Sequence, residues 1–491
     1  MPSLIVVDDP VDWRHALPDV EVVSARQYLT DSSFVARRAL KVFNLCRSYR
    51  YQSSGYYVSL LAAARGHRPL PGVQTIQDFK TPVIVRTISE ELNELIQKSL
   101  GHLQCKDFTL SIYFGRNLAK RYDRLSRKLF GLFPAPMLRA QFSWSIRMSR
   151  WLLQSIGPVS VDDLPEDHHP FLLEAASSYF SGKGRPPKSK SPSRYDLAIL
   201  VGPPDGDDLP SNARALNLFE RAAQKQGFAV ERIGRDDYGR LAEFDALFIR
   251  ETTSVNHHTY RFARRAAAEG LVVVDDPDSI VKCTNKVFLA ELLERHRLPR
   301  PKTLVVHRGN RERIADELGF PVVLKQPDSS FSQGVVKAVD PAQLKEHLDR
   351  LLCRSDLVIA QEYLPTSFDW RVGIFDRQPL YGCRYYMADE HWQILKRDDQ
   401  GKKTEGRYDT LPVENLPTPV LRLALKAANL IGDGFYGVDL KQVGNRVYVI
   451  EVNDNPNIDA GVEDKVLKHE LYERIMRVML RRVERRKGKS L

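Results

Sequence analysis

Hydrophobic and polar positions alternate regularly after residue 195. Short apolar runs, DLAILVG, FAVERIG, DALFIRE and LVVVDDP, are separated by LNLFERAAQKQG and HTYRFARRAAAEG, in which apolar residues recur at helical spacing. Short apolar runs bounded by turn residues predict buried strands, and the helical spacing predicts amphipathic helices. Because strands and helices alternate, we predict a small open α/β sheet over residues 196–284.

Strand patterns dominate the next region, residues 285–485. The apolar runs are KTLVVHR, PVVLKQ, VVKAVD, LVIAQEYL, DWRVGIF and PLYGCRYYM, and the helical segments RERIADELG and PAQLKEHLDRLLCR lie between some of them. This order predicts an antiparallel α+β region. Residues 1–180 are predicted to form a separate α/β domain, with strands near LIVVDD, VEVVSA, FTLSIYFG and PMLRAQFSW, and they contain no catalytic signature.

The segment between the two parts, residues 181–195, reads SGKGRPPKSKSPSRY. It is rich in Lys, Arg, Ser, Pro and Gly and has almost no apolar side chain to bury, so we predict a solvated linker. Anion binding is the alternative role of this basic segment. Residues 486–491 form a basic tail.

Composition narrows the class of protein. The chain has 491 residues, too many for one hydrophobic core, and 43% of them are hydrophobic. A net charge of +11 favours polyanionic partners, which include nucleotides, nucleic acid and acidic proteins. No apolar run approaches the ~18 residues of a membrane span, and the start MPSLIVVDDPVDW lacks a secretory pattern, so we expect a soluble cytoplasmic protein. The five cysteines lack CxxC spacing, which argues against a zinc knuckle or a disulfide framework.

The stretch VYVIEVNDNPNID, residues 447–459, begins as a buried strand but contains Glu451 and Asn453. Strand alternation predicts that Val447, Val449, Glu451 and Asn453 share one face. A buried carboxylate without a partner is costly, so Glu451 requires a ligand. The preceding GFYGVDLKQVGNR adds Asp439 on a neighbouring strand. Oxygen donors of this kind fit Mg²⁺ completed by phosphate oxygens.

The hairpin register decides whether these carboxylates meet. A two-residue loop, Gly444 and Asn445, would pair Asp439 with Ile450 and place the carboxylates on opposite faces. A three-residue loop that includes Arg446 would align Asp439 with Glu451. A surface hairpin with solvated polar groups is the remaining alternative.

Phosphate binding requires a cradle other than a Walker A loop or a GxGxxG motif, because neither occurs in the chain. Lys286 in TNKVFL and Lys325 in PVVLKQ emerge from apolar surroundings, where an ammonium group can bind phosphate. The loop PDSSFSQGVVK, which includes Gly334, has backbone N–H groups that could close over phosphates. Surface lysines and a plain hairpin loop are the structural alternatives.

Taken together, the order of these motifs resembles the RimK-like α-L-glutamate ligase group of the ATP-grasp superfamily. The motifs are a lysine that opens a helix, a strand lysine, a small-residue loop, QEYL, DWR, and GVDL followed by VIEVNDNP. The resemblance covers residues 196–485. Residues 1–180 resemble the amino-terminal domain of some RimK-like proteins.

The resemblance implies an ATP-grasp fold, with a small α/β pre-grasp domain (196–284) and two α+β subdomains (285–485) that hold ATP between them. It implies the following roles: Lys286, Lys325 and Gly334 at the phosphates, Glu362, Tyr363 and Leu364 at the adenine, Asp369 near the ribose, Asp439, Glu451 and Asn453 on Mg²⁺ (Mn²⁺ as an alternative), and Arg371 and Arg384 facing the carboxyl substrate. A structural salt bridge is the competing role for either arginine. Lys396 is expected at the phosphates or at the acceptor.

Two segments depart from the family pattern. The loop SSFSQG has fewer glycines than the usual phosphate loop. The segment HWQILKRDDQGKKTEGRYD replaces the arginine- and glycine-rich acceptor segment of RimK enzymes, which indicates a different acceptor.

The resulting hypothesis is an ATP-dependent carboxylate-amine ligase that acts through an acyl phosphate on an amino acid and a peptide, protein or small-molecule acceptor. One alternative is an RNA- or ribosome-binding module that uses the basic linker and the helix RIMRVMLRRVERRKGKSL. Another is a kinase that stops at a phosphorylated product. The two adjacent histidine pairs, His168 with His169 and His257 with His258, fit loop or helix-start positions better than catalysis.

Overall fold

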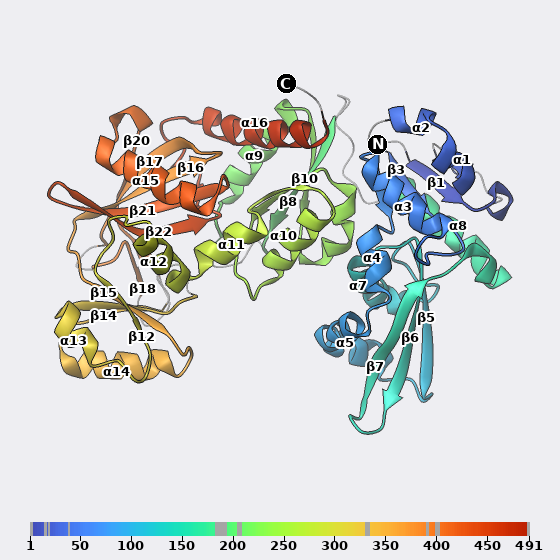
Figure 1. Ribbon diagram of the computed structural model, residues 1–491, viewed down its shortest axis with the longest axis horizontal. Helices are drawn as coiled ribbons and strands as arrows, with labels where there is room; N and C mark the ends of the chain where they lie inside the picture. The colour runs from blue at the N-terminus through green and yellow to red at the C-terminus, as the bar shows by residue number, and fades with distance from the viewer. Residues whose placement is uncertain are drawn as a thin grey trace. The chain divides into compact units, whose positions relative to one another are not determined.

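The computed structural model describes residues 3–13, 17, 20–37, 40–181, 194–203, 209–328, 334–388, 392–397 and 403–488 (Figure 1). The chain divides into two compact units. Unit 1 comprises residues 1–188 and 236–242, and unit 2 comprises residues 189–235 and 243–491. The predicted linker, 181–195, lies mostly outside the described residues. Among the described helices, none has both the length and the apolar character needed to cross a lipid bilayer.

Unit 1 contains a parallel sheet and an antiparallel sheet, and the strands predicted near LIVVDD, VEVVSA, FTLSIYFG and PMLRAQFSW are confirmed. The parallel sheet has the order β2-β1-β3-β4, with β1 (Ser3–Val7), β2 (Val20–Ser24), β3 (Lys41–Asn44) and β4 (Arg68–Leu70). The antiparallel sheet consists of β5 (Asp107–Tyr113), β6 (Met137–Ser145) and β7 (Arg150–Pro158). The helices are α1 (Ala25–Thr30), α2 (Ser33–Ala36), α3 (Ser54–Ala64), α4 (Val73–Asp78), α5 (Pro82–Glu91), α6 (Asn93–Leu100), α7 (Asp123–Leu132) and α8 (His169–Ser181).

Unit 2 begins with the predicted small α/β sheet, which is parallel throughout and has the order β11-β10-β8-β9. Its strands are β8 (Tyr195–Val201), β9 (Phe228–Ile233), β10 (Ala246–Arg250) and β11 (Val272–Val274), and its helices are α9 (Ala213–Lys225), α10 (His258–Ala268) and α11 (Pro277–Thr284). The last helix, α16 (His469–Arg486), lies beside α9 (Figure 1), and the rings of Phe219 and Tyr472 meet at 4.8 Å between centroids. The carboxy-terminal helix therefore completes the core of this first sheet.

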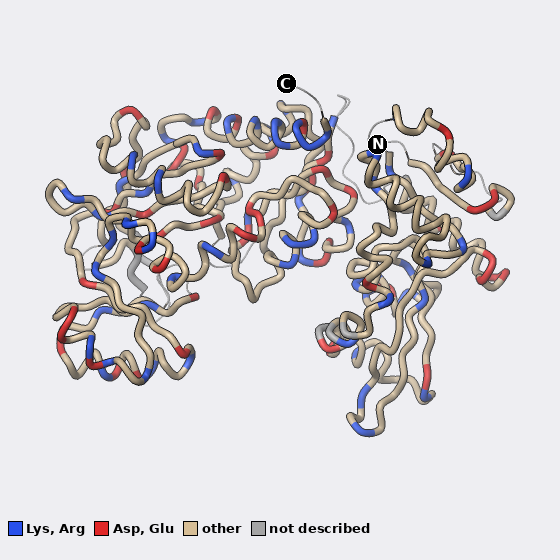
Figure 2. Tube along the Cα trace, viewed as in Figure 1, with Lys and Arg blue, Asp and Glu red and all other residues tan. Residues whose placement is uncertain are grey.

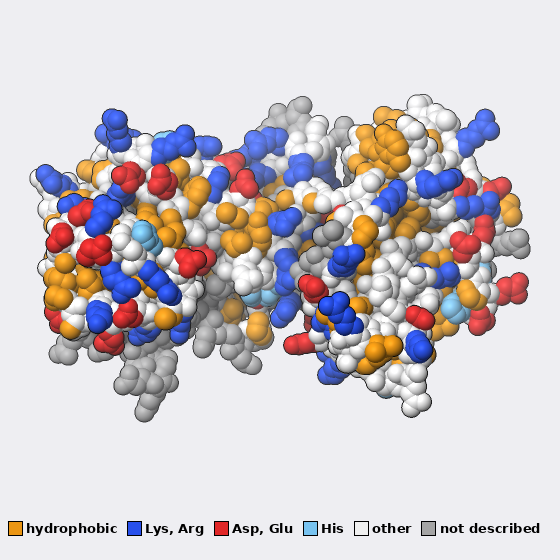
Figure 3. All heavy atoms as spheres, turned by 60° about the horizontal axis from the view of Figure 1, so that its bottom comes forward, with side chains coloured by type: hydrophobic (Ala, Val, Ile, Leu, Met, Phe, Trp, Pro, Cys, Tyr) orange, Lys and Arg blue, Asp and Glu red, His pale blue; other side chains and the backbone are white. Residues whose placement is uncertain are grey.

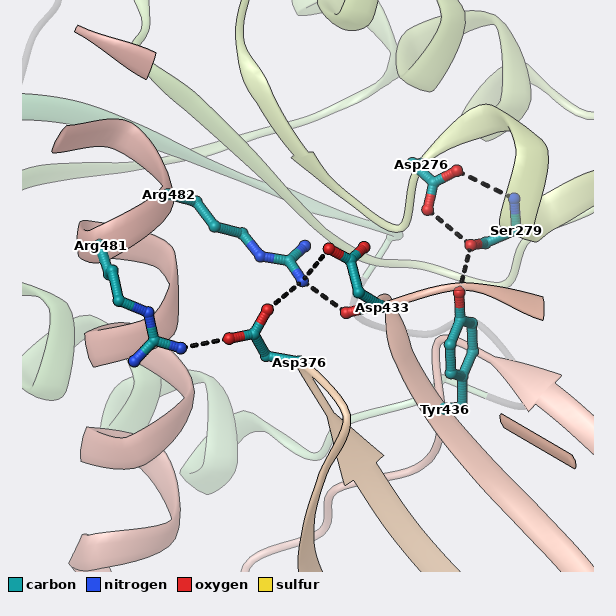
Figure 4. Close-up of polar contacts among 7 residues, drawn as sticks. All are labelled: Asp276, Ser279, Asp376, Asp433, Tyr436, Arg481 and Arg482. Atoms are coloured by element: carbon teal, nitrogen blue, oxygen red, sulfur yellow. Dashed lines mark hydrogen bonds and ion pairs between the residues drawn. The ribbon is translucent and has the colours of Figure 1, made fainter. Parts of the chain in front are cut away.

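The basic face of α16 is used for packing. Lys and Arg recur along this helix (Figure 2). Arg481 and Arg482 both pair with Asp376, and Arg482 also reaches Asp433 (Figure 4). The Tyr436 and Ser279 hydroxyls lie 2.7 Å apart. This contact, drawn in Figure 4, joins α11 to the sheet described next.

The α+β region consists of two antiparallel sheets, and its six predicted strands are confirmed. The first sheet has the order β12-β15-β13-β14, with β12 (Thr303–Val306), β13 (Val322–Lys325), β14 (Val335–Ala338) and β15 (Val358–Glu362). The second has the order β20-β17-β16-β21-β22, with β16 (Phe368–Phe375), β17 (Gln378–Tyr386), β20 (Tyr408–Leu411), β21 (Phe435–Val443) and β22 (Arg446–Asp454). A small ribbon joins β18 (Leu395–Arg397) to β19 (Lys403–Glu405), and the helices are α12 (Lys286–Arg295), α13 (Arg313–Leu318), α14 (Pro341–Leu352) and α15 (Thr418–Ile431).

The β21–β22 hairpin combines a two-residue loop with a β-bulge. Val443 pairs with Arg446, so the loop is Gly444 and Asn445, yet Asp439 pairs with Glu451. The register shifts between Asp439 and Leu440 because Ile450 is an extra residue in β22. The sequence analysis considered loops of two and three residues but no bulge. The bulge aligns the carboxylates although the loop has only two residues.

The bulge also corrects the predicted faces of β22. Val447 and Val449 lie in the hydrophobic core together with Val452, not on the face of Glu451 and Asn453. Because the extra residue reverses the alternation, Glu451 and Asn453 line a cavity on the opposite side of the sheet. The prediction that these two polar residues share a face holds, but the valines do not share it with them.

Candidate functional site

A cavity of about 550 Å³ in unit 2 collects most of the predicted site residues. Both antiparallel sheets and the start of α12 contribute to its walls. The predicted residues that line it are Lys286, Lys325, Glu362, Tyr363, Leu364, Asp369, Arg371, Asp439, Glu451 and Asn453. Residues that are far apart in the sequence thus form one polar site.

Charged partners surround the two aligned carboxylates. Arg371 donates two hydrogen bonds to Asp439, Nε to Oδ1 at 2.7 Å and an Nη to Oδ2 at 2.8 Å. The Asn453 amide donates to Asp439 Oδ2 at 3.0 Å, which leaves its carbonyl oxygen as an acceptor. Lys286 Nζ lies 2.9 Å from Glu451 Oε1. Two carboxylates and an amide oxygen at one place match the oxygen donors that Mg²⁺ prefers.

The electrostatics of this cluster favour an anionic ligand. Although burial opposes it, the charges of Lys286 and Lys325 hold the pKa of Glu451 below its usual value. Burial lowers the pKa of Lys325 from 10.5 to about 8, and the charge of Glu451 offsets only part of this effect. Lys325 is half-buried, and an ammonium group whose desolvation is only partly compensated binds a phosphate favourably.

Local structure brings the two lysines together. The Asn285 side chain caps α12 by accepting from the N–H groups of Val287 and Phe288. The same side chain donates to Asp328 at 2.9 Å, and the Lys286 N–H donates to the Pro327 carbonyl at 3.0 Å. These contacts tie the first residue of α12 to the segment that follows β13, which ends at Lys325.

Lys441 is a site residue that sequence reasoning missed. It lies two positions after Asp439 on β21, lines the cavity, and donates to Asp369 Oδ1 at 2.6 Å and to Thr366 at 2.7 Å. Burial raises the pKa of Asp369, and the charge of Lys441 opposes that rise. The alternation of GVDLK, which puts Asp439 and Lys441 on one face, was the available signal.

The segment after β15 forms the other wall. The Lys302 N–H donates to the Glu362 carboxylate at 2.7 Å, and the Glu362 N–H donates to the Lys302 carbonyl at 3.0 Å. The Lys337 ammonium lies 4.8 Å from the ring centre of Tyr363 and 5.4 Å from that of Trp392. Trp392, which the sequence analysis did not select, therefore adds an aromatic surface to the cavity.

Three predicted residues are not placed at the site. Arg384 pairs with Asp409 and lies over the rings of Phe368 and Trp370, on the face of the sheet opposite to Arg371. The structure thus shows the structural salt bridge that was the competing role of Arg384, and its substrate contact stays a prediction. Gly334, at φ +72°, accepts a backbone hydrogen bond from Gln326 and is not among the described residues that line the cavity. Residues 329–333 of the predicted phosphate loop lie outside the described residues.

Lys396 belongs to β18, and its side chain lies outside the described part of the structure. Its predicted contact with phosphate or acceptor stays a prediction.

Comparison with known proteins matches both halves of the chain to one group. Residues 25–175 match the RimK-like ATP-grasp N-terminal domain, and residues 283–479 match the RimK-like ATP-grasp domain. The alpha-aminoadipate–LysW ligase LysX of Sulfolobus acidocaldarius is 29% identical over 255 residues, which cover 48% of this chain and 86% of that protein. The tetrahydromethanopterin:alpha-L-glutamate ligase of Methanocaldococcus jannaschii is 25% identical over 210 residues, or 40% of this chain and 69% of that protein.

Solved structures include a D-alanine–D-alanine ligase from Bacillus anthracis, which is 15% identical and has a TM-score of 0.46. The match covers 60% of this chain and all of that one.

Proposed function

The chain belongs to the RimK-like ATP-grasp ligases, and from this premise we propose that the cavity of unit 2 joins a carboxylate to an amine. The observation that carries the proposal is the convergence of two lysines and three oxygen donors in one cavity. The lysines suit phosphates, and the oxygen donors suit the metal that accompanies them.

Lys286 and Lys325 would bind the phosphates of ATP. Both ammonium groups belong to the same cluster as Glu451, and burial leaves Lys325 with a lowered pKa that a phosphate would reverse. Glu362, Tyr363 and Leu364 would hold the adenine, and the cavity-lining Ile450 adds an apolar surface. Asp369, held in place by Lys441, would accept from the ribose hydroxyls.

Asp439, Glu451 and Asn453 would hold Mg²⁺. Bound there, the ion would neutralise phosphate charge and orient the γ-phosphate. The bulge sets the two carboxylates opposite each other, and Asn453 adds a neutral oxygen. Arg371 holds the Asp439 carboxylate in its orientation through two paired hydrogen bonds.

The reaction needs activation because a free carboxylate is a poor electrophile. In the proposed sequence, a carboxylate oxygen attacks the γ-phosphorus, the bond to the β-phosphate oxygen breaks, and ADP leaves. The amine then attacks the acyl carbon of the acyl phosphate, the C–N bond forms, inorganic phosphate departs, and the amine gives up a proton. The chain contributes position and charge: the lysines hold the phosphates, and Arg371 faces the developing acyl phosphate from the cavity wall.

An amino acid is the proposed substrate class for one of the two groups that are joined. The names of the relatives mention alpha-aminoadipate and L-glutamate as one partner, and LysW and tetrahydromethanopterin as the other. The acceptor of this chain is proposed to be an amino acid, a peptide or a protein that presents a carboxylate.

The test is Mg²⁺-dependent ADP release by the purified full chain, screened against single amino acids and pairs, with mass spectrometry of each active mixture. We expect ADP release that requires one carboxylate and one amine and yields their amide mass. Glu451→Gln should lower the rate about 100-fold or more, the scale of losing one electrostatic contact in the transition state. Glu414→Gln, at an exposed position of the same region, is the matched control and should leave the rate unchanged.

Other outcomes would replace the proposal. ADP release without an amine, with a stable phosphorylated product, would identify a kinase. RNA binding that survives Glu451→Gln, with no ADP release from any mixture, would favour the binding module. The structure weakens this second reading, because the arginines of α16 pair within the chain and because basic and acidic side chains are interspersed among the described residues on the face of unit 2 drawn in Figure 3.

A further inference from the structure

A second group of potential metal ligands lies at the end of β10, outside the set of residues that line the cavity. Glu251 directly follows β10, His257 precedes α10 at its N-cap position, and His258 is the first residue of that helix. One donor atom from each side chain lies within 4.8 Å of the others. Ligand sites of open parallel sheets form at the carboxyl ends of strands, which is where this group lies.

The group consists of an ion pair and a second histidine beside it. His258 Nε2 lies 3.0 Å from Glu251 Oε2, and both side chains are buried. This contact gives the buried carboxylate one partner. The ring of His257 lies 4.0 Å from that of His258, centroid to centroid, so a second imidazole lies beside this pair.

Hydrogen bonding favours one tautomer of His257. The Thr259 hydroxyl donates to the Thr252 carbonyl at 3.3 Å, so its oxygen is left to accept from His257 Nδ1, 3.0 Å away. With the proton on Nδ1, the Nε2 atom of neutral His257 carries a lone pair. Metal-binding histidines are oriented in this way, by a hydrogen bond from the nitrogen that does not coordinate the metal.

We propose that Glu251, His257 and His258 form a binding site for a divalent transition metal such as Zn²⁺, separate from the Mg²⁺ site proposed in the cavity. Two imidazole nitrogens and one carboxylate oxygen suit Zn²⁺, Co²⁺ or Ni²⁺, whereas Mg²⁺ prefers oxygen ligands throughout. Binding would replace the contact between His258 and Glu251 with a bond from each side chain to the metal. Three protein ligands leave a fourth position for water.

Bound metal would hold a wall of the cavity in place. Thr252, Thr253 and Ser254, which follow Glu251, line the cavity, and the Glu251 carbonyl accepts from the Asn455 amide at 2.7 Å. Asn455 lies two residues after Asn453. A metal that joins Glu251 to the start of α10 would therefore fix both ends of the 251–258 segment beside the nucleotide site.

The test is zinc binding by the full chain after treatment with EDTA and dialysis, measured by competition with a chromophoric chelator in excess Mg²⁺. Wild type should bind one zinc per chain at this site, and Co²⁺ should give a visible absorption band. His257→Gln and Glu251→Gln each remove a metal ligand and should weaken zinc binding by about 100-fold or more. Loss of an outer-shell partner alone weakens metal binding by about 10- to 100-fold, and loss of a ligand should cost at least as much.

Two controls make the result specific. His169→Gln alters the other adjacent histidine pair, also at a helix start, and should leave zinc affinity unchanged. Glu451→Gln should also leave it unchanged, because the two proposed metal sites share no residue. His257→Gln retains the buried pair of His258 and Glu251, so circular dichroism should show a folded protein.

Zinc affinity that is equal in wild type and in folded His257→Gln and Glu251→Gln would overturn the proposal. So would the absence of zinc binding in the wild type, or loss of zinc binding in Glu451→Gln but not in Glu251→Gln. None of these readouts depends on ligase activity, so the outcome is independent of the proposed function.

Discussion

Nucleotide affinity should fall as pH rises through the pKa of Lys325. In the free protein this pKa is about 8, lowered from 10.5 by burial. A nucleotide phosphate beside the ammonium favours its charged form and raises the pKa again. Above pH 8, binding must therefore take up a proton that is already present at lower pH, so the affinity decreases with increasing pH.

The size of the effect follows from the two pKa values. If the bound complex restores the value of 10.5, the pKa difference is about 2.5, which corresponds to about 3 kcal/mol at about 1.36 kcal/mol per pKa unit. Linkage then predicts about 20-fold weaker binding at pH 9.5 than at pH 7.5, with uptake of about 0.9 proton per nucleotide at pH 9. The free energy of unfolding of the free protein has the opposite pH dependence, because it should increase as pH rises. The charged lysine destabilises the folded state below pH 8, and this cost disappears as the lysine deprotonates between pH 8 and 10.5.

Isothermal titration calorimetry with ADP, in buffers of different ionisation enthalpy, measures the affinity and the proton uptake. EDTA in the buffer removes any contribution from metal. Lys325→Arg keeps its charge throughout this range, so its affinity should be nearly independent of pH. Lys286→Arg, the matched control, should retain the wild-type slope. Wild-type affinity that stays constant from pH 7.5 to 9.5, or a slope that persists in Lys325→Arg, would refute the reasoning.

Three further predictions concern packing, register and a spectroscopic signal. Asp376→Asn should lower the free energy of unfolding, measured in urea, by about 2 kcal/mol, because Arg482, whose side chain is 13% exposed, loses a charged partner. Asp356→Asn, at an exposed position, should have little effect, and equal urea midpoints for the wild type and Asp376→Asn would contradict the assigned role of the pair. Deletion of Ile450 should preserve Mg²⁺-dependent nucleotide binding at reduced affinity, because every cross-strand pair of the hairpin is kept; complete loss in a folded variant would contradict this account of the bulge. Nucleotide should change the tryptophan fluorescence of the wild type but not that of Trp392→Phe. A nucleotide-induced change of the same size in the variant would exclude Trp392 as the reporter.

Much of the fold was predictable because local patterns agree with the tertiary structure. The apolar runs of the small sheet and of the two antiparallel sheets each became a strand, and Lys286 opens a helix, as the sequence predicted. The polar interruption of β22 at Glu451 also pointed to the cavity, because a carboxylate within an apolar strand requires a charged partner. Here the partner is Lys286.

The remaining features depend on contacts that no local pattern specifies. The bulge at Ile450 has no glycine to mark it, so alternation alone assigned Val447 and Val449 to the wrong face. The face of Arg384 is set by its pairing with Trp370 on another strand. In the same way, the contact between Lys441 and Asp369 joins two strands that are far apart in the sequence.

The bulge in the β21–β22 hairpin has a consequence for how such a site can diversify. Because Ile450 and Glu451 are consecutive and both face the cavity, gain or loss of a single codon at this position changes the apolar floor of the pocket while Asp439 stays opposite Glu451. Elsewhere in a strand, one inserted residue would turn every following side chain to the other face. Nucleotide preference and metal binding can therefore change independently within one hairpin. Libraries of variants that substitute or delete residue 450 would vary the nucleotide preference while they keep the metal ligands.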